Sequence, residues 1–124
     1  MGGMRVLVVD DSRSVRARLL SLLSEAGVVV VGEASDGLEA LALIDEHAPD
    51  VIILDLEMPR MGGLEVLRQL RSIQSRPRAI VYTNHGGERY RAECLRLGAD
   101  SFLDKSAEFE SVIAAVTRRE TPGS

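Results

Sequence analysis

Five polar side chains follow short apolar runs, and their types could bind a metal ion and a phosphoryl group. They are three aspartates, a threonine and a lysine, namely Asp10, Asp11, Asp55, Thr83 and Lys105. If each apolar run is a strand of one parallel sheet, the residues after the runs meet at the carboxyl edge of that sheet. We therefore expect these five side chains to form one site.

The chemistry of such a site follows from its charge. Two carboxylates about 5 Å apart repel by about 3 kcal/mol at an effective dielectric near 20. A cluster of three persists by raising a pKa or by holding a cation. Oxygen donors without Cys or nearby His suit Mg²⁺, which also takes a phosphate oxygen. A lysine and a hydroxyl position phosphoryl groups, and a carboxylate can itself accept one as an aspartyl phosphate.

Apolar runs alternate with amphipathic stretches along the chain. The predicted strands are Val6–Val9, Val28–Val31, Val51–Leu54, Ala79–Tyr82 and Ser101–Leu103. The predicted helices run from Arg13 to Ala26, from Ser35 to Pro49, over Leu64–Ile73, from Gly87 to Gly98 and from Phe109 to Val116. Because the runs are apolar without alternation, we expect a parallel sheet buried on both faces. The pattern predicts a doubly wound α/β fold with helices on both faces.

Composition limits the classes of function. The 124 residues fit one domain, which we place at residues 4–118, with residues 1–3 as an N-terminal extension and 119–124 as a frayed tail. A net charge of −4 and the absence of Trp argue against nucleic acid or an anionic membrane as the main partner. A single cysteine, Cys94, excludes an internal disulfide. With no transmembrane run or secretion signal, we expect a cytoplasmic location.

Four segments together resemble the receiver domain of two-component response regulators. They read Val-Val-Asp-Asp-Ser at 8–12, Leu-Asp-Leu-Glu-Met-Pro-Arg-Met-Gly-Gly at 54–63, Val-Tyr-Thr-Asn at 81–84 and Phe-Leu-Asp-Lys at 102–105. The resemblance extends from about Met4 to Arg118. It implies a flavodoxin-like sheet with strand order 2-1-3-4-5, as in the chemotaxis receiver. It also implies a signalling phosphoacceptor that assists its own phosphorylation and dephosphorylation rather than an enzyme.

The resemblance implies a role for each residue around the predicted acceptor. Asp55 would receive the phosphoryl group from a histidine kinase or a phosphotransfer protein, and Lys105 would hold a phosphoryl oxygen. Asp10, Asp11 and Asp55 would bind Mg²⁺ together with the backbone carbonyl of Glu57, with Asp11 a direct ligand. We expect a monomer or a weak homodimer acting on an output protein that the sequence does not name.

Two further residues would form the switch by the same resemblance. The Thr83 hydroxyl would move toward the phosphoryl group, and Phe102 would fill the space that this opens. The surface of the fourth helix, fifth strand and fifth helix would then change. The alternatives are a plain hydroxyl at a strand end for Thr83 and plain half-buried packing for Phe102.

Three positions depart from the family pattern. Ser106 follows Lys105 where proline is usual, and we expect a trans peptide there, because a cis non-proline bond costs about 3–4 kcal/mol. Gly62 replaces a residue that would cap the third helix. Asn84 replaces a small residue.

The lifetime of the phosphorylated state depends on water reaching the phosphoryl group in line. Asn84 should narrow that approach, and the charge of Glu57 should disfavour a hydroxide-like attacker. His85 could oppose both by positioning water. We expect faster decay in Asn84→Ala.

Other readings remain open. The chain is either a stand-alone receiver or a receiver from a longer regulator with a DNA-binding or enzymatic output. A remote alternative is an aspartyl-nucleophile phosphatase of the haloacid-dehalogenase kind, although that class usually has Asp where Glu57 stands. Arg13, Arg16 and Arg18 form either a solvated helix face or a docking site for an acidic kinase surface.

Overall fold

The computed structural model describes residues 3–84, 87–107 and 109–118, which form one parallel sheet flanked by helices. The sheet order is β2-β1-β3-β4-β5. The strands are β1 (Arg5–Val9), β2 (Val29–Ala34), β3 (Val51–Leu54), β4 (Arg78–Thr83) and β5 (Ser101–Asp104). The helices are α1 (Arg13–Glu25), α2 (Gly37–His47), α3 (Gly63–Leu70), α4 (Glu88–Arg96) and α5 (Phe109–Thr117). The predicted fold and strand order are confirmed.

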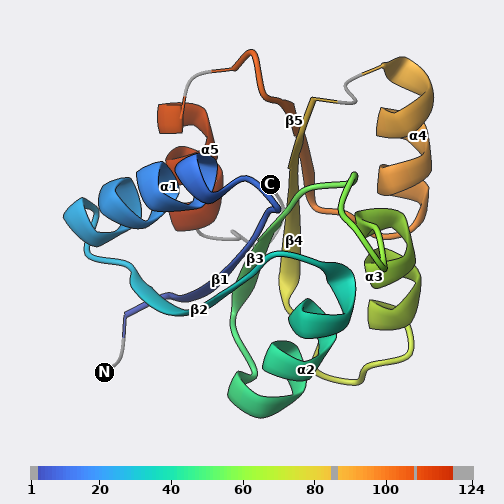
Figure 1. Cartoon of the computed structure of the whole chain (residues 1–124), viewed down its shortest axis with the longest axis horizontal. Coiled ribbons are helices and arrows are strands. Elements are labelled where there is room, and N and C mark those ends of the chain that lie inside the picture. The colour runs from blue at the N-terminus through green and yellow to red at the C-terminus, as the bar shows by residue number, and fades with distance from the viewer. Residues whose placement is uncertain (1–2, 85–86, 108, 119–124) are drawn as a thin grey trace.

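The helices divide between the two faces of the sheet, with α1 and α5 on one side and α2, α3 and α4 on the other (Figure 1). Successive residues of β1 point to opposite faces. Val6 and Val8 pack in the layer under α1 and α5, whereas Leu7 and Val9 pack in the layer under the other three helices. All four side chains are fully buried. This burial on both faces holds the carboxyl end of β1 in place.

The edge strand β2 differs from the prediction. It runs from Val29 to Ala34, later than the predicted Val28–Val31, and Val29 is 47% exposed. Its pairing with β1 also shifts register between Val6 and Leu7. Because β2 lies at the edge of the sheet, the helices do not cover it fully, and the prediction that every strand is buried on both faces is wrong here.

Helix α3 is shorter than its hydrophobic pattern predicts. It ends at Leu70, and Ile73 is 37% exposed. The backbone N–H groups of Arg71, Ser72 and Ile73 donate to carbonyls three residues earlier, at 3.0–3.3 Å. Such bonds tighten the last turn and end an α-helix. The helical spacing of apolar residues therefore extends to Ile73, three residues beyond the end of α3.

Within the described residues, none of the helices has the length and apolar character needed to span a bilayer.

Candidate functional site

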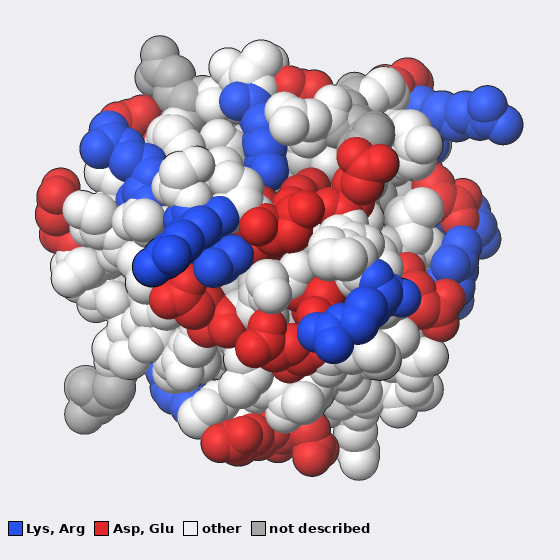
Figure 2. All heavy atoms as spheres, in the orientation of Figure 1, with Lys and Arg blue, Asp and Glu red and all other residues white. Residues whose placement is uncertain are grey.

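The three predicted aspartates come together at the carboxyl ends of β1 and β3. These strands are paired neighbours, with Val9 opposite Leu54. One carboxylate oxygen from each of Asp10, Asp11 and Asp55 lies within 4.8 Å of the others. Figure 2 shows acidic side chains gathered near the middle of this face, with basic side chains on either side. The sheet topology therefore concentrates negative charge at one edge.

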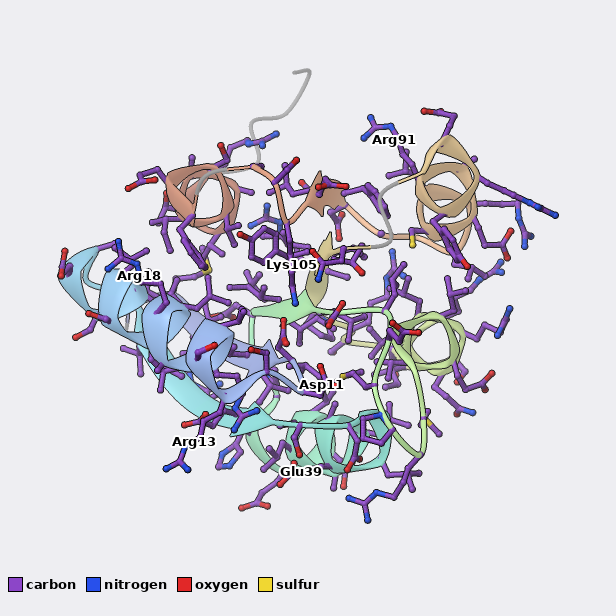
Figure 3. All side chains as sticks on the ribbon, turned by 45° about the horizontal axis from the view of Figure 1, so that its top comes forward. Asp11, Arg13, Arg18, Glu39, Arg91 and Lys105 are labelled. Atoms are coloured by element: carbon purple, nitrogen blue, oxygen red, sulfur yellow. The ribbon has the colours of Figure 1, made fainter. Side chains whose placement is uncertain are left out.

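Lys105 supplies positive charge to this cluster from the end of β5. Its Nζ lies 2.7 Å from Asp10 Oδ2 and 3.3 Å from Asp55 Oδ2. In Figure 3 the Lys105 side chain reaches into the central space beside Asp11. Its backbone N–H donates to the Thr83 carbonyl at 2.8 Å, which fixes the start of the loop. Lysine and aspartates from three strands thus meet at one point.

Burial sets the protonation chemistry of this pair. Asp10 is 2% exposed, and burial raises the pKa of its carboxyl despite the hydrogen bond from Lys105. Burial alone would lower the pKa of Lys105, but the hydrogen bond and charge of Asp10, together with Asp55, raise it above its usual value. Lys105 is therefore charged at neutral pH and offsets the repulsion among the carboxylates.

Backbone donors orient the two buried carboxylates. Asp10 Oδ1 accepts the Ser12 N–H at 2.8 Å, and Asp55 Oδ1 accepts the Leu56 N–H at 2.8 Å. In both residues the other oxygen, Oδ2, faces Lys105. Each carboxylate is consequently held by one oxygen and presents the other to the site.

Arg16 fixes the end of β1 in a way that the sequence did not reveal. Its Nη1 donates to the Asp10 carbonyl at 2.7 Å, and its Nε pairs with Glu33 at 2.8 Å. Arg13 and Arg18 instead project from α1 in different directions, and Arg18 lies 5.8 Å from the centre of the Phe109 ring (Figure 3). The three arginines therefore do not form one helix face.

Glycine allows the loop after Asp55 to fold back on the strand. The Gly63 N–H donates to the Leu56 carbonyl at 2.9 Å. A Cβ on Gly63 would lie 2.2 Å from the Asp55 carbonyl oxygen, and one on Gly62 would lie 2.8 Å from that of Leu56. Gly62 is the N-cap of α3 and makes no side-chain cap, as the sequence predicted. A capping side chain would not fit this loop without movement.

An ion pair anchors the same loop to α2. The Arg60 guanidinium binds the buried Asp36 carboxylate, and the Met61 carbonyl accepts the Gly37 N–H at 2.9 Å. Asp36 also caps α2 by accepting the Glu39 N–H at 2.9 Å. That hydrogen bond, followed by Arg60, holds the pKa of Asp36 below its usual value. Neither contact has a local sequence signal, because the partners are 24 residues apart.

An open pocket of about 430 Å³ lies over the cluster. Its lining includes Asp11, Asp55 and Lys105, together with Glu57, Met58 and Asn84 from the loops after β3 and β4. Asp55 is 5% exposed yet borders this pocket, so its carboxylate can be approached from solvent. The donor set is carboxylate oxygen, which fits Mg²⁺ rather than a softer metal.

The two predicted switch residues lie below this surface. Thr83 is fully buried at the end of β4. Phe102 is 8% exposed and packs in the same apolar layer as Cys94 and Leu97, so it is buried rather than half-buried. Their proposed movement stays a prediction. His85 lies outside the described residues.

The loop after β5 has the expected trans geometry. The described residues contain no cis peptide, so the Lys105–Ser106 bond is trans. The Ser106 N–H donates to Asp104 Oδ1 at 2.7 Å. The chain thus accommodates Ser106 in place of proline through a local turn.

Comparison with known proteins identifies the family of this chain. Residues 6–117 match the model of the response regulator receiver domain. The chain belongs to this family. The receiver domain is 44% identical over 121 residues to the response regulator MprA of Mycobacterium sp. (strain KMS), which covers 95% of this chain and 52% of MprA. It is 35% identical over 114 residues to protein CcdB of Bacillus subtilis (strain 168), which covers 92% and 95%.

Solved structures agree with this assignment. The signal receiver domain of NarL from Mycobacterium tuberculosis superposes with a TM-score of 0.86 at 35% identity, covering 96% of this chain and all of that one. A chain of the CheX-CheY-BeF3-Mg+2 complex from Borrelia burgdorferi has a TM-score of 0.86 at 28% identity, covering 94% and 90%. The receiver domain thus spans about half of MprA and nearly all of CcdB.

Proposed function

We propose that this receiver domain is a phosphoacceptor switch in which Asp55 takes a phosphoryl group from a histidine kinase or a phosphotransfer protein. The observation that carries the proposal is the placement of Asp55. One oxygen is held by the Leu56 N–H, and the other faces Lys105 at the floor of an open pocket. A carboxylate held in this way is oriented for attack on phosphorus.

The transfer exchanges one bond for another. Asp55 Oδ attacks phosphorus, the bond from phosphorus to the imidazole nitrogen of the donor breaks, and the electron pair returns to the imidazole. Lys105 holds a phosphoryl oxygen by a charge-assisted hydrogen bond. Asp10, Asp11, Asp55 and the Glu57 carbonyl would hold Mg²⁺, which supplies positive charge to the phosphoryl oxygens.

Contacts between β4, β5 and α4 support a route to the α4–β5–α5 surface. Lys105 and Thr83 are joined by the backbone hydrogen bond between their strands. The Phe102 carbonyl in turn accepts a 3.5 Å hydrogen bond from Arg91 on α4. In the proposal, the Thr83 hydroxyl moves toward the phosphoryl group and Phe102 follows. Thr83→Ala should therefore accept phosphate but fail to change this surface.

Two relatives of different length suggest where the output partner of this receiver domain lies. The match to half of MprA supports an output within a longer regulator, and the match to nearly all of CcdB supports an output in a separate protein. Either arrangement fits a cytoplasmic signalling protein that is a monomer or a weak homodimer. Glu57 and Asn84, which border the pocket, and His85 are proposed to set the lifetime of the phosphorylated state.

Intact-protein mass after incubation with acetyl phosphate tests the proposal. We expect one phosphate adduct in the presence of Mg²⁺ and none after chelation. Asp55→Asn should remove the adduct, whereas the matched variant Asp45→Asn, on exposed α2, should retain it. Asp11→Asn should require more Mg²⁺. A full adduct on Asp55→Asn protein would contradict the assignment.

A further inference from the structure

Arginine is concentrated in the part of the chain that contains α4 and the end of α3. Residues 68–98 contain seven arginines and two glutamates, although the whole chain has a net charge of −4. Several of these arginines lie on exposed helix surfaces. This stretch of the chain is therefore basic, although the whole chain is acidic.

A continuous groove runs between α3 and α4, which lie side by side in Figures 1 and 3. Three pockets compose it, and Arg68 borders all three. Leu64 and Tyr90 border the two nearer the phosphorylation site. One of these two pockets also has Glu57 in its lining, and Glu57 borders the pocket over the proposed phosphorylation site as well. We call this surface the α3–α4 groove.

The two ends of the α3–α4 groove differ in chemistry. The far end, about 590 Å³, is bordered by Arg68, Arg71, Ser72, Arg96 and Leu97, with no carboxylate among them. The near end is mixed: Leu64 and Tyr90, which is 43% exposed, border it together with the charged side chains of Glu65, Arg89 and Glu93. An occupant that matches both ends places carboxylates at the far end and an apolar group beside Leu64 and Tyr90.

Two of the arginines at the far end, Arg68 and Arg96, form exposed ion pairs. Arg68 lies 3.2 Å from Glu65 and Arg96 lies 2.6 Å from Glu93, each within one helix. The two guanidinium side chains are 50% and 65% exposed. Exposed pairs of this kind contribute little to stability, so a carboxylate from another molecule can replace the intrahelical partner.

We infer that the α3–α4 groove binds an acidic, amphipathic protein segment. Its carboxylates contact Arg68, Arg71 and Arg96, and its apolar side chain packs against Leu64 and Tyr90. A uniformly charged polyanion such as nucleic acid, or a flat anionic membrane, fits less well, because Glu65 and Glu93 would repel it at the near end and it has no apolar side chain to pack against Leu64 and Tyr90. In Figure 2, acidic and basic atoms lie together at the right edge, over these helices.

This surface is separate from the α4–β5–α5 surface of the proposed function. Arg91 projects from the other side of α4, toward β5, where it contacts the Phe102 carbonyl (Figure 3). Arg91→Glu therefore makes the same charge change as Arg96→Glu on the same helix, but outside the groove. Arg18→Glu makes it on α1, across the sheet.

Fluorescence anisotropy with a labelled peptide tests the inference. The probe has about 12 residues, which rise about 18 Å as a helix and so exceed the rise of about 13 Å along the nine residues of α4. One half contains Asp and Glu, and the other half contains Leu and Phe. We expect saturable binding to the unphosphorylated full chain. Arg68→Glu and Arg96→Glu should each weaken it at least about tenfold, whereas Arg91→Glu and Arg18→Glu should change it less than about twofold.

Several outcomes would overturn the inference. These are no binding to the wild-type chain, equal weakening by Arg91→Glu, and equally tight binding of a scrambled peptide. Tighter binding of phosphatidylserine vesicles or duplex DNA, with the same pattern among the variants, would assign the surface to those ligands instead. Circular dichroism establishes that each variant is folded. Asp55→Asn should bind the peptide normally, so failure of the phosphoacceptor assignment would not be confused with failure of the groove.

Discussion

The proposed phosphorylation site and the α3–α4 groove use charge in opposite ways. At the site, Asp10 is 2% exposed and the Lys105 side chain is 11% exposed. In the groove, the Arg68 and Arg96 side chains are at least half exposed. A buried charge needs a partner fixed by the fold, whereas an exposed charge keeps most of its hydration. The first arrangement suits chemistry at one fixed point, and the second suits exchange of one carboxylate partner for another.

Removing the lysine should produce the largest effect. Lys105→Met leaves the buried Asp10 and Asp55 carboxylates without their ammonium partner, so the free energy of unfolding should fall by about 3 kcal/mol at neutral pH. Urea denaturation without divalent ions measures this. Arg96→Ala, which breaks the exposed pair with Glu93, should change stability far less, because the Arg96 guanidinium is 65% exposed and stays hydrated.

A second substitution separates charge from packing at the same site. Asp10→Asn in the Lys105→Met background removes one of the repelling carboxylates and should recover most of the lost stability. No recovery would mean that repulsion between the two carboxylates is not the source of the loss. Similar losses for Lys105→Met and Arg96→Ala would remove the contrast between the two regions.

Backbone packing gives the next largest effect. Gly63→Ala places a Cβ 2.2 Å from the Asp55 carbonyl oxygen, which forces the loop away from β3. We expect a loss of about 2 kcal/mol and slower phosphorylation from acetyl phosphate, because Asp55 moves with the loop. Gly32→Ala is the control, since its nearest neighbour, the Leu7 side chain, would be 3.4 Å away. Equal phosphorylation rates in the two variants would contradict this account of the loop.

Much of the site could be predicted because its residues follow strands. Asp10, Asp55 and Lys105 each stand at the end of an apolar run, and parallel topology brings strand ends together whatever the loops do. The strand order itself came from the resemblance to receiver domains and is confirmed. At the ends of the strands, the apolar pattern and the receiver-domain motifs therefore predicted the same site residues.

The supporting contacts could not be predicted, because they join residues far apart in the chain. Arg16 contacts both Glu33 and the Asp10 carbonyl, and Arg60 contacts Asp36. Each arginine has the sequence context of a solvated charge, and only the tertiary fold brings its partner close. The groove has the same origin, since Arg68 and Arg96 are 28 positions apart by their numbers and belong to different helices.

The pH dependence of stability tests the burial of Cys94, which packs in the apolar layer under α2, α3 and α4. Burial, aided by the charge of Glu93, raises the pKa of its thiol to about 11. The unfolded chain therefore releases this proton at lower pH than the folded chain, and stability falls as pH rises from about 9 toward 11. At pH 10 the loss should be about 1 kcal/mol. Cys94→Ala should remove this pH-dependent loss of stability. If stability fell equally with pH in the wild-type protein and in Cys94→Ala, the thiol of Cys94 would not be the titrating group.

The smallest expected change in stability comes from replacing two glycines that occupy the same position in two helices. Gly62 and Gly87 are the N-caps of α3 and α4, and neither makes a side-chain cap. Among the residues that the structure describes, a Cβ on Gly87 would meet nothing within 4 Å, whereas one on Gly62 would lie 2.8 Å from the Leu56 carbonyl oxygen. Gly87→Ser should stabilise the protein by about 0.5 kcal/mol, through a cap and a less flexible unfolded chain. Gly62→Ser gains the same cap and the same loss of freedom in the unfolded chain. Its close contact with Leu56 should nevertheless make the substitution destabilising, by up to about 1 kcal/mol.

Thermal denaturation of both variants, with unchanged urea m-values, measures the difference in stability between them. If Gly62→Ser were as stabilising as Gly87→Ser, the loop beside Asp55 would be free to move, and its close packing would not be what fixes the acceptor.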